Sequence, residues 1–172
     1  MPSIIKVRSN RYRADYSVQR KRHIKGIHIP LPNYQQEDSH SCSYIATLTV
    51  CRYLGVKATD EDILSVVRCT QNGGADGEQV QAALKQLGIT HNYRDDLIVG
   101  DLWYHVHKMI PVMLTVWPWD WSGDHWVVVQ GFSDNRIHLT NHYSMTLDEF
   151  WDEWVSNWED GAKHGCGIAC IL

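Results

Sequence analysis

The chain has 172 residues, of which 44% are hydrophobic and 21% are charged. This length and balance are those of one domain with a packed core, and they exclude a chain that is disordered throughout. The sequence has no run of 18 consecutive apolar residues, and its first residues lack the apolar centre of a signal peptide. We therefore expect a cytoplasmic protein without a membrane span.

Positive charge is concentrated at the N-terminus. Residues 1–25 hold eight Lys or Arg and one Asp, a net charge of +7, so the total of −4 leaves −11 on the rest of the chain. We divide the chain into a basic N-terminal arm, residues 1–28, and one folded domain, residues 29–172. Such an arm can stay solvated, dock on the acidic domain, or contact nucleic acid or an acidic membrane surface. Because no nucleic-acid-binding motif accompanies it, we favour the first two.

Helices are predicted for the first half of the domain. The apolar run at 42–54 ends at Gly55, which is typical of a buried helix stopped by a left-handed glycine. Thr59 begins a Thr-Asp-Glu-Asp sequence that predicts an N-cap. A second cap at Asp76 precedes apolar residues at helical spacing, and a further helix is predicted at about residues 101–108.

Strands are predicted for the second half. Apolar runs rich in β-branched residues predict strands at residues 110–117, 125–132 and 136–141. A turn at 134–135 makes the last two a hairpin. A capping-box pattern at 146–149 predicts a helix, and residues 166–172 predict a final strand. We therefore expect an α+β domain with a helical N-terminal half and an antiparallel sheet in the C-terminal half.

The cysteines do not suggest disulfides. There are five, an odd number without regular spacing: Cys42, Cys51, Cys69, Cys166 and Cys170. A chain of this size has no need of disulfides, so we expect reduced thiols, with Cys51 and Cys69 in the core. Neither these cysteines nor the ten histidines match a zinc signature. We expect no metal and no cofactor.

Cys42 stands at the predicted start of the first helix. The positive end of the helix dipole and unpaired backbone N–H groups favour a thiolate there, so we expect a lowered Cys42 pKa. The Cys42 N–H can also stabilise an oxyanion, with the amide of Gln36 as a second donor. Gln35, beside it, is the alternative donor. This arrangement predicts a nucleophilic cysteine.

His125, at the start of the second predicted strand, is the candidate base. With a two-residue turn, Asn141 falls opposite Val128 and within reach of the His125 imidazole, which it can orient. Asp124 competes for the orienting role.

Each of these residues also has a purely structural interpretation. Cys42 can be a core residue, His125 a strand-end histidine bonded to a carbonyl, and Asn141 a turn residue. His40 can be a second base near Cys42, or simply a loop residue.

Four of the eight tryptophans lie between residues 117 and 126. Trp119 and Trp121 stand among Pro, Asp and Gly residues that disfavour regular structure. We expect them either to line a substrate cleft or to cap the core.

From about Ile29 onward the motifs resemble, in order and spacing, the bacteriocin-processing, or double-glycine, branch of the papain-like cysteine peptidases. The matching motifs are Gln36-x5-Cys42 at a helix start, the run HWVVVQGF from His125, and a strand ending Leu-Thr-Asn at Asn141. The resemblance implies a papain-like fold and a Cys-His-Asn site with a glutamine oxyanion donor, carried by Cys42, His125, Asn141 and Gln36.

The sequence departs from that family at two places. Asn141-His142 stands where Asp-Pro is usual, and Cys42-Ser43 stands where Cys-Gly is usual. The best known members are fused to a membrane transporter, and this sequence has neither membrane spans nor an ATPase. Cleavage of leader peptides during export is therefore not carried over.

We predict a thiol-dependent peptidase that acts on a peptide or protein substrate. Two alternatives stay open, because a fold alone does not fix a function. One is an acyltransferase or amidase that acts on a small molecule, and the other is a non-catalytic binding module.

Overall fold

The computed structural model describes residues 26–69, 74–117, 125–141, 143–155 and 165–172. The arm at residues 1–25 lies outside this range. Residues 27 and 28, which the sequence assigned to the arm, form a short strand on the domain. The division at residue 28 stays a prediction. None of the helices in the described ranges is long and apolar enough to cross a membrane.

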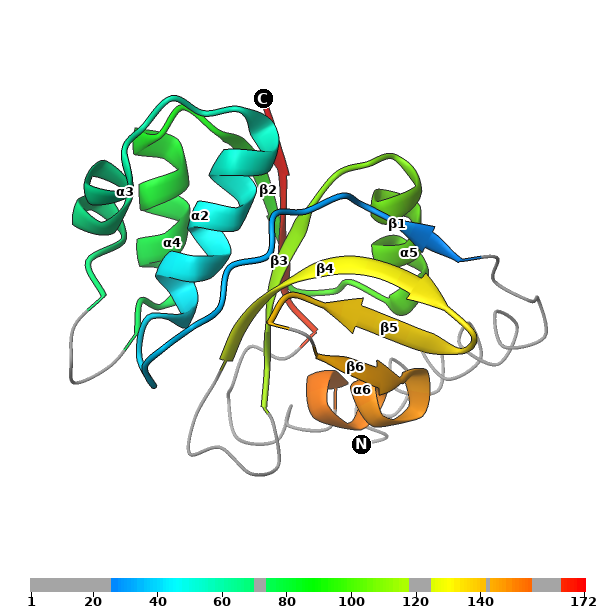
Figure 1. Ribbon diagram of the computed structural model, residues 1–172. Helices are drawn as coiled ribbons and strands as arrows, with labels where there is room; N and C mark the ends of the chain where they lie inside the picture. Colours follow the sequence, from blue (N-terminus) through cyan, green and yellow to red (C-terminus); the bar gives the residue numbers. More distant parts are fainter. Residues whose placement is uncertain (1–25, 70–73, 118–124, 142, 156–164) are drawn as a thin grey trace, which may run out of the picture.

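Three helices form one half of the domain (Figure 1): α2 (Cys42–Leu54), α3 (Asp60–Val67) and α4 (Gly77–Gln86). All three were predicted. Gly55 ends α2 with a φ of 76°, a left-handed conformation that glycine adopts at little cost. Capping boxes begin α3 at Thr59 and α4 at Asp76, as their sequences indicated.

The other half is built on a sheet. Its seven strands are β1 (Ile27–His28), β2 (Thr90–Arg94), β3 (Val112–Val116), β4 (His125–Ser133), β5 (Arg136–Leu139), β6 (Ser144–Thr146) and β7 (Gly167–Ile171). They pair in the antiparallel order β2-β7-β3-β4-β5-β6, and β1 also pairs with β4. The predicted strands are confirmed as β3, β4, β5 and β7. The sequence did not predict β1, β2 or β6.

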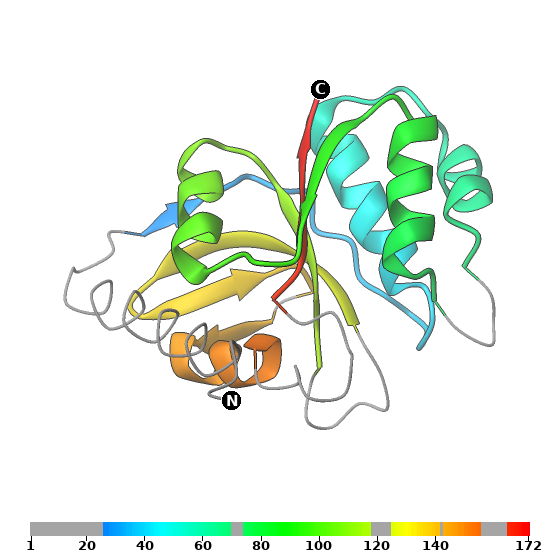
Figure 2. The same ribbon diagram turned by 180° about the vertical axis from the view of Figure 1, so that it is seen from behind.

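The two halves meet where α2 packs against β4 and α4 packs against β2. Figures 1 and 2 show α5 (Val99–His107) and α6 (Leu147–Val155) lying against the sheet, away from the three-helix group. One continuous core joins the halves, with Trp154, Phe132 and Phe150 among its largest fully buried side chains. The predicted α+β arrangement is confirmed.

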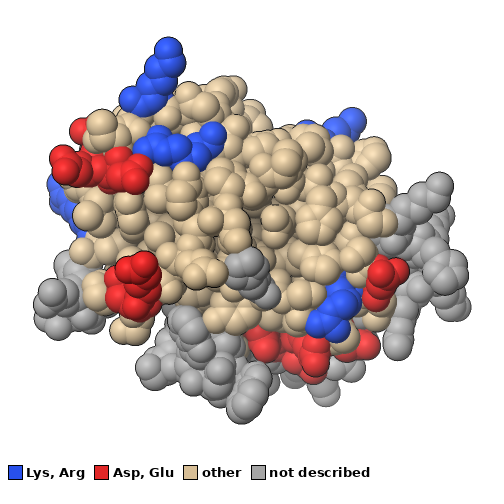
Figure 3. Space-filling view, viewed as in Figure 1, with Lys and Arg blue, Asp and Glu red and all other residues tan. Residues whose placement is uncertain are grey.

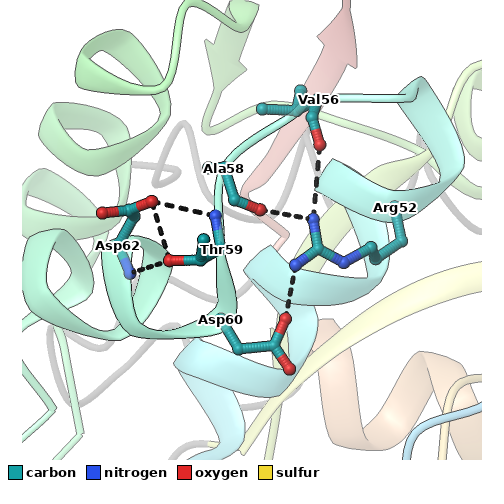
Figure 4. A network of polar contacts seen from close by, with 6 residues as sticks. All are labelled: Arg52, Val56, Ala58, Thr59, Asp60 and Asp62. Atoms are coloured by element: carbon teal, nitrogen blue, oxygen red, sulfur yellow. Dashed lines mark hydrogen bonds and ion pairs between the residues drawn. The ribbon is translucent and has the colours of Figure 1, made fainter.

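Arg52 holds the connection between α2 and α3 (Figure 4). Its guanidinium donates to the carbonyls of Val56 and Ala58, at 3.3 and 2.8 Å, and pairs with Asp60. Thr59 and Asp62 complete the reciprocal cap of α3 beside it. Two backbone carbonyls of the connection, which belong to no helix or strand, are thereby hydrogen bonded.

The β4–β5 hairpin contains a bulge. Near its turn, Ser133 pairs with Arg136, but between Val129 and Gly131 the register shifts by one residue. As a result, Thr140 and not Asn141 lies opposite Val128, with its N–H 3.0 Å from the Val128 carbonyl. The predicted position of Asn141 is wrong by one residue, because a bulge adds a residue to one strand of a pair.

The short strand β1 requires a glycine on β4. It pairs His28 with Gly131, and a Cβ at Gly131 would lie 2.3 Å from the carbonyl oxygen of Ile27 and 2.9 Å from the His28 ring. Because the first contact is with backbone, rotation of a side chain cannot relieve it.

We expect Gly131→Ala to detach β1 and to lower the free energy of unfolding by about 1–3 kcal/mol, as overpacking of a core does. Gly77→Ala is the matched control, because a Cβ added at Gly77 would meet no atom within 4 Å and this residue begins a helix. Urea denaturation of both variants gives the comparison. Equal stability of Gly131→Ala and wild type would contradict the close approach of β1.

Candidate active site

Cys42 is the first residue of α2, and the turn before it is fixed by Asp38. The Asp38 carboxylate accepts the N–H groups of His40 and Ser41, at 2.8 and 2.7 Å. Ser41, the N-cap residue, makes no side-chain hydrogen bond to the helix. The first turn of α2 therefore begins without a side-chain cap, and its N–H groups face the region of the Cys42 sulfur.

The Cys42 sulfur lies against the start of β4. The N–H groups of Trp126, Ser43 and Cys42 itself interact with it. Trp126 and Val128 are two residues apart, so both direct their N–H groups to the side of β4 on which β5 pairs. The sulfur therefore lies beside β4, beyond the end of β5. It contacts the N–H of Trp126, the residue that follows His125 in the sequence. The N-terminal end of α2 can be seen there in Figure 1.

His125 begins β4 opposite Val116. Its side chain is 1% exposed, and its ring makes an edge contact with Tyr143, with the ring centres 5.6 Å apart. Tyr143 belongs to the segment that follows β5, so this contact brings that segment against the imidazole.

Asn141 lies in the same segment, in the connection between β5 and β6. Its φ of 62° is left-handed, a conformation that asparagine tolerates better than most residues. Its Oδ1 atom is buried and has no hydrogen-bond partner within the described part of the chain. Thr140, before it, is bonded to Val128, and Tyr143, after it, contacts His125. The loop that carries Asn141 is thus held at the His125 end of β4, and the structural interpretation as a turn residue also applies.

Gln36 lies on the segment before α2. Both atoms of its side-chain amide are buried, and neither has a hydrogen-bond partner among the residues that the structure describes. Gln35 is exposed to solvent. Gln36 therefore directs its amide into the protein, whereas Gln35 lies at the surface.

The other candidates have different outcomes. His40 is partly exposed, with its Nδ1 3.5 Å from the Asp38 carboxylate. Cys51 is fully buried in the core, as predicted, whereas Cys69 is only partly buried. Trp119, Trp121 and Asp124 lie outside the described residues. In the described ranges no group of three or more His, Cys, Asp or Glu could hold a metal ion.

Burial decides the protonation of Cys42 and His125. It raises the pKa of the Cys42 thiol above 9.0, and the three backbone N–H groups offset only part of this effect. It also lowers the pKa of His125 from 6.5 to about 4. The expected lowering of the Cys42 pKa is therefore wrong, because desolvation outweighs the helix terminus. At neutral pH the resting residues are a thiol and a neutral imidazole.

Three further residues lie near the Cys42 sulfur that the sequence did not predict as residues of the site: Ser43, Gly74 and Trp126. A Cβ at Gly74 would lie 3.8 Å from the Cys42 sulfur. The proximity of Gly74 to Cys42 joins residues that are 32 positions apart in the sequence, and no local pattern predicts such a contact.

Several solved structures share this fold. The peptidase domain of Streptococcus ComA, a bifunctional ABC transporter of a quorum-sensing pathway, is 17% identical, with a TM-score of 0.64 over 84% of this chain and 98% of that one. A C39-like peptidase from Bacillus anthracis is 14% identical, with a TM-score of 0.67 over 87% and 98%. A double glycine motif protease of an AMS/PCAT transporter, in complex with the leader peptide, is 14% identical, with a TM-score of 0.63 over 86% and 97%. The fold is papain-like, as the resemblance implied.

No curated protein matches the sequence. The sequence model of the Peptidase C39 family, in contrast, matches residues 31–158. This range begins before Gln36 and ends after Asn141. Because this match spans most of the chain, the protein belongs to the Peptidase C39 family and is a cysteine peptidase.

Proposed function

We propose that the protein hydrolyses peptide bonds with Cys42 as nucleophile, His125 as base, Asn141 as the residue that orients His125, and Gln36 as an oxyanion donor. The observation that carries this proposal is the state of two amide side chains. Both amide atoms of Gln36 and Oδ1 of Asn141 are buried without partners among the described residues. Nearly all buried polar groups in native proteins are hydrogen bonded, so such exceptions require an explanation. The missing partner of the Gln36 amide is explained if this amide donates a hydrogen bond to the oxyanion that forms during the reaction.

The pKa values favour attack from a neutral pair. His125, with a pKa of about 4, is a free base at neutral pH, and Cys42 carries its proton. His125 takes that proton as the sulfur attacks the carbonyl carbon, so charge develops only when substrate has filled the site. His125 then gives the proton to the leaving amine, and water releases the acyl group.

The oxyanion needs donors that are already in place. The N–H of Cys42 stands in the uncapped first turn of α2, and the buried amide of Gln36 comes from the residues just before the turn that Asp38 fixes. Donors that need no reorganisation contribute most to the stabilisation of such a transition state. Oδ1 of Asn141 can accept a ring N–H of His125 and thereby select its tautomer.

We propose a peptide substrate. The AMS/PCAT protease of the same fold binds a leader peptide. Figure 3 supports this choice, because the acidic side chains lie around the edges of this face, among them those over α3 and near α6, and its middle carries few charges. An uncharged peptide segment can lie there without the desolvation of charged groups.

Cys42→Ala is expected to abolish cleavage, and His125→Ala to reduce kcat/KM by about 10³-fold or more, as the loss of a nucleophile or its base does. A proteome-derived peptide library is incubated with each protein, and new termini are identified by mass spectrometry. Cys51→Ala is the matched control, because Cys51 is buried in the core. Cleavage by Cys42→Ala at the wild-type rate would refute the proposal.

Gln36→Ala is expected to lower kcat by about 10²-fold, the effect of removing one oxyanion donor. Gln35→Ala, the neighbouring and exposed glutamine, should leave kcat unchanged. Once the library has provided a cleaved peptide, its turnover by both variants gives the comparison. Equal loss in the two variants would assign the effect to the loop and not to the Gln36 amide.

His125 should also make stability depend on pH. Its pKa is about 4 in the folded protein and 6.5 without burial, so the unfolded chain binds the proton first as the pH falls. The contribution is fully present above pH 6.5 and is lost between about pH 6.5 and 4, with a total of about 3 kcal/mol. We expect the wild type to lose this much more stability than His125→Gln over that window, measured by urea unfolding. Parallel losses would mean that the pKa of His125 is not lowered.

A further inference from the structure

We propose that Ser43 and Trp126 are positioning residues that hold the backbone of Gly74 and Ala75 over the Cys42 sulfur. The proposal rests on the assigned role of Cys42 and adds residues that act through Ala75. It concerns how the nucleophile is enclosed before substrate arrives.

The Ala75 backbone is bonded from both halves of the domain. Its N–H donates to Oγ of Ser43 on α2, at 3.1 Å, and its carbonyl accepts from Nε1 of Trp126 on β4, at 2.8 Å. Ser43 is 0%, Ala75 4% and Trp126 7% exposed. Water therefore competes weakly for these bonds, and leaving one of their groups unpaired would cost more than at the surface. We call this pair of hydrogen bonds the Ala75 bridge.

The Ser43 hydroxyl also contacts Cys69, with Oγ and Sγ 3.0 Å apart. Because Oγ accepts the N–H of Ala75, its own hydrogen can be donated to the Cys69 sulfur. One buried hydroxyl thus holds the α3–α4 connection at two points, Cys69 and Ala75.

The bridge places Gly74 against the nucleophile. A Cβ at Gly74 would lie 3.8 Å from Sγ of Cys42, 3.6 Å from Oγ of Ser43 and 3.5 Å from the His40 carbonyl. These are ordinary contact distances, so a methyl group at Gly74 would just touch the sulfur, and the Gly74 backbone lies about one methyl group away from it. The N–H of Trp126 interacts with the same sulfur from β4. Trp126 therefore acts on Cys42 in two ways. Its backbone N–H interacts with the sulfur directly, and its indole holds Ala75, which follows Gly74.

This enclosure explains why the sulfur is hidden although it begins a helix. Cys42 is 5% exposed, and burial is the largest cause of its raised pKa. If the bridge is removed, water should reach the sulfur, thiolate should form more readily, and the sulfur should lose its fixed position beside His125. Reactivity toward a small reagent and catalytic rate should then change in opposite directions.

The test uses Trp126→Phe and Ser43→Ala, which remove the two partners of Ala75. The matched controls are Trp154→Phe and Thr49→Val. Trp154 is a buried indole that donates to the Cys166 carbonyl at 3.4 Å, and Thr49 is a buried hydroxyl on α2 that donates to the Ile45 carbonyl at 2.8 Å. Alkylation of Cys42 by iodoacetamide is measured by mass spectrometry as a function of pH, and alkylation of the buried Cys51 reports any general unfolding.

In both bridge variants we expect the midpoint of Cys42 alkylation to fall by about one pH unit, which raises its rate near pH 8 about tenfold. Cleavage of a library-derived peptide should fall about tenfold. Cys51 should stay protected, and both control variants should behave as wild type. Because both bonds act through Ala75, the double variant should change little beyond the larger single effect.

Gly74→Ala provides an independent test, because this variant is expected to slow the alkylation of Cys42, whereas the bridge variants are expected to speed it up. Its methyl group fits at contact distance and leaves both bonds of the bridge in place, so alkylation of Cys42 should slow about tenfold, by about 1.4 kcal/mol of barrier. Unchanged alkylation in this variant, unchanged profiles in both bridge variants, or exposure of Cys51 together with Cys42 would each overturn the proposal. If the wild type cleaves no peptide, the proposed function fails, but the alkylation arms still decide the role of the bridge.

Discussion

The packing of α2 against β4 is the contact on which the rest of the structure depends. A helix that is apolar on most sides cannot lie on a surface, so both the other helices and the sheet must close around it. Residues Cys42 to Cys51 are almost all buried as a result. The same closure places the N-terminal end of the helix at the first residues of β4. The meeting of Cys42 with the strand of His125 is therefore a consequence of core packing.

This closure also decides the balance of electrostatic effects at the site. A helix N-terminus stabilises a negative charge by about 0.3–1 kcal/mol, and by about 2 kcal/mol at most, so it changes a pKa by no more than about 1.5 units. Burial of His125, in comparison, lowers its pKa from 6.5 to about 4. Desolvation is also the largest cause of the raised Cys42 pKa, so it favours the uncharged forms of both residues. In the resting protein the two residues are therefore a thiol and a neutral imidazole. The proton passes from Cys42 to His125 only when substrate is bound.

The sequence predicted those features that depend on local patterns. The bounds of α2, the caps at Thr59 and Asp76, and the apolar strands β3 and β4 all follow from residue types at fixed spacing. The strands that it did not predict are a half-exposed polar strand, β2, and two of three residues or fewer, β1 and β6, which exist only through pairing. The protonation state of Cys42 and the contacts of Ser43 and Trp126 could not be predicted, because both depend on which segments the fold brings together.

The bulge in β4 has a consequence for how this chain can vary. It shifts the register between Val129 and Gly131, and the carbonyl of Gln130 between them accepts the N–H of Ile29. Side chains alternate across a sheet, so one residue more or fewer in the hairpin turns every later side chain to the other face. The number of residues between His125 and Asn141 is thus a structural parameter in its own right. Substitutions in this hairpin can be absorbed one at a time, whereas a single insertion or deletion would separate the imidazole from the loop that reaches it.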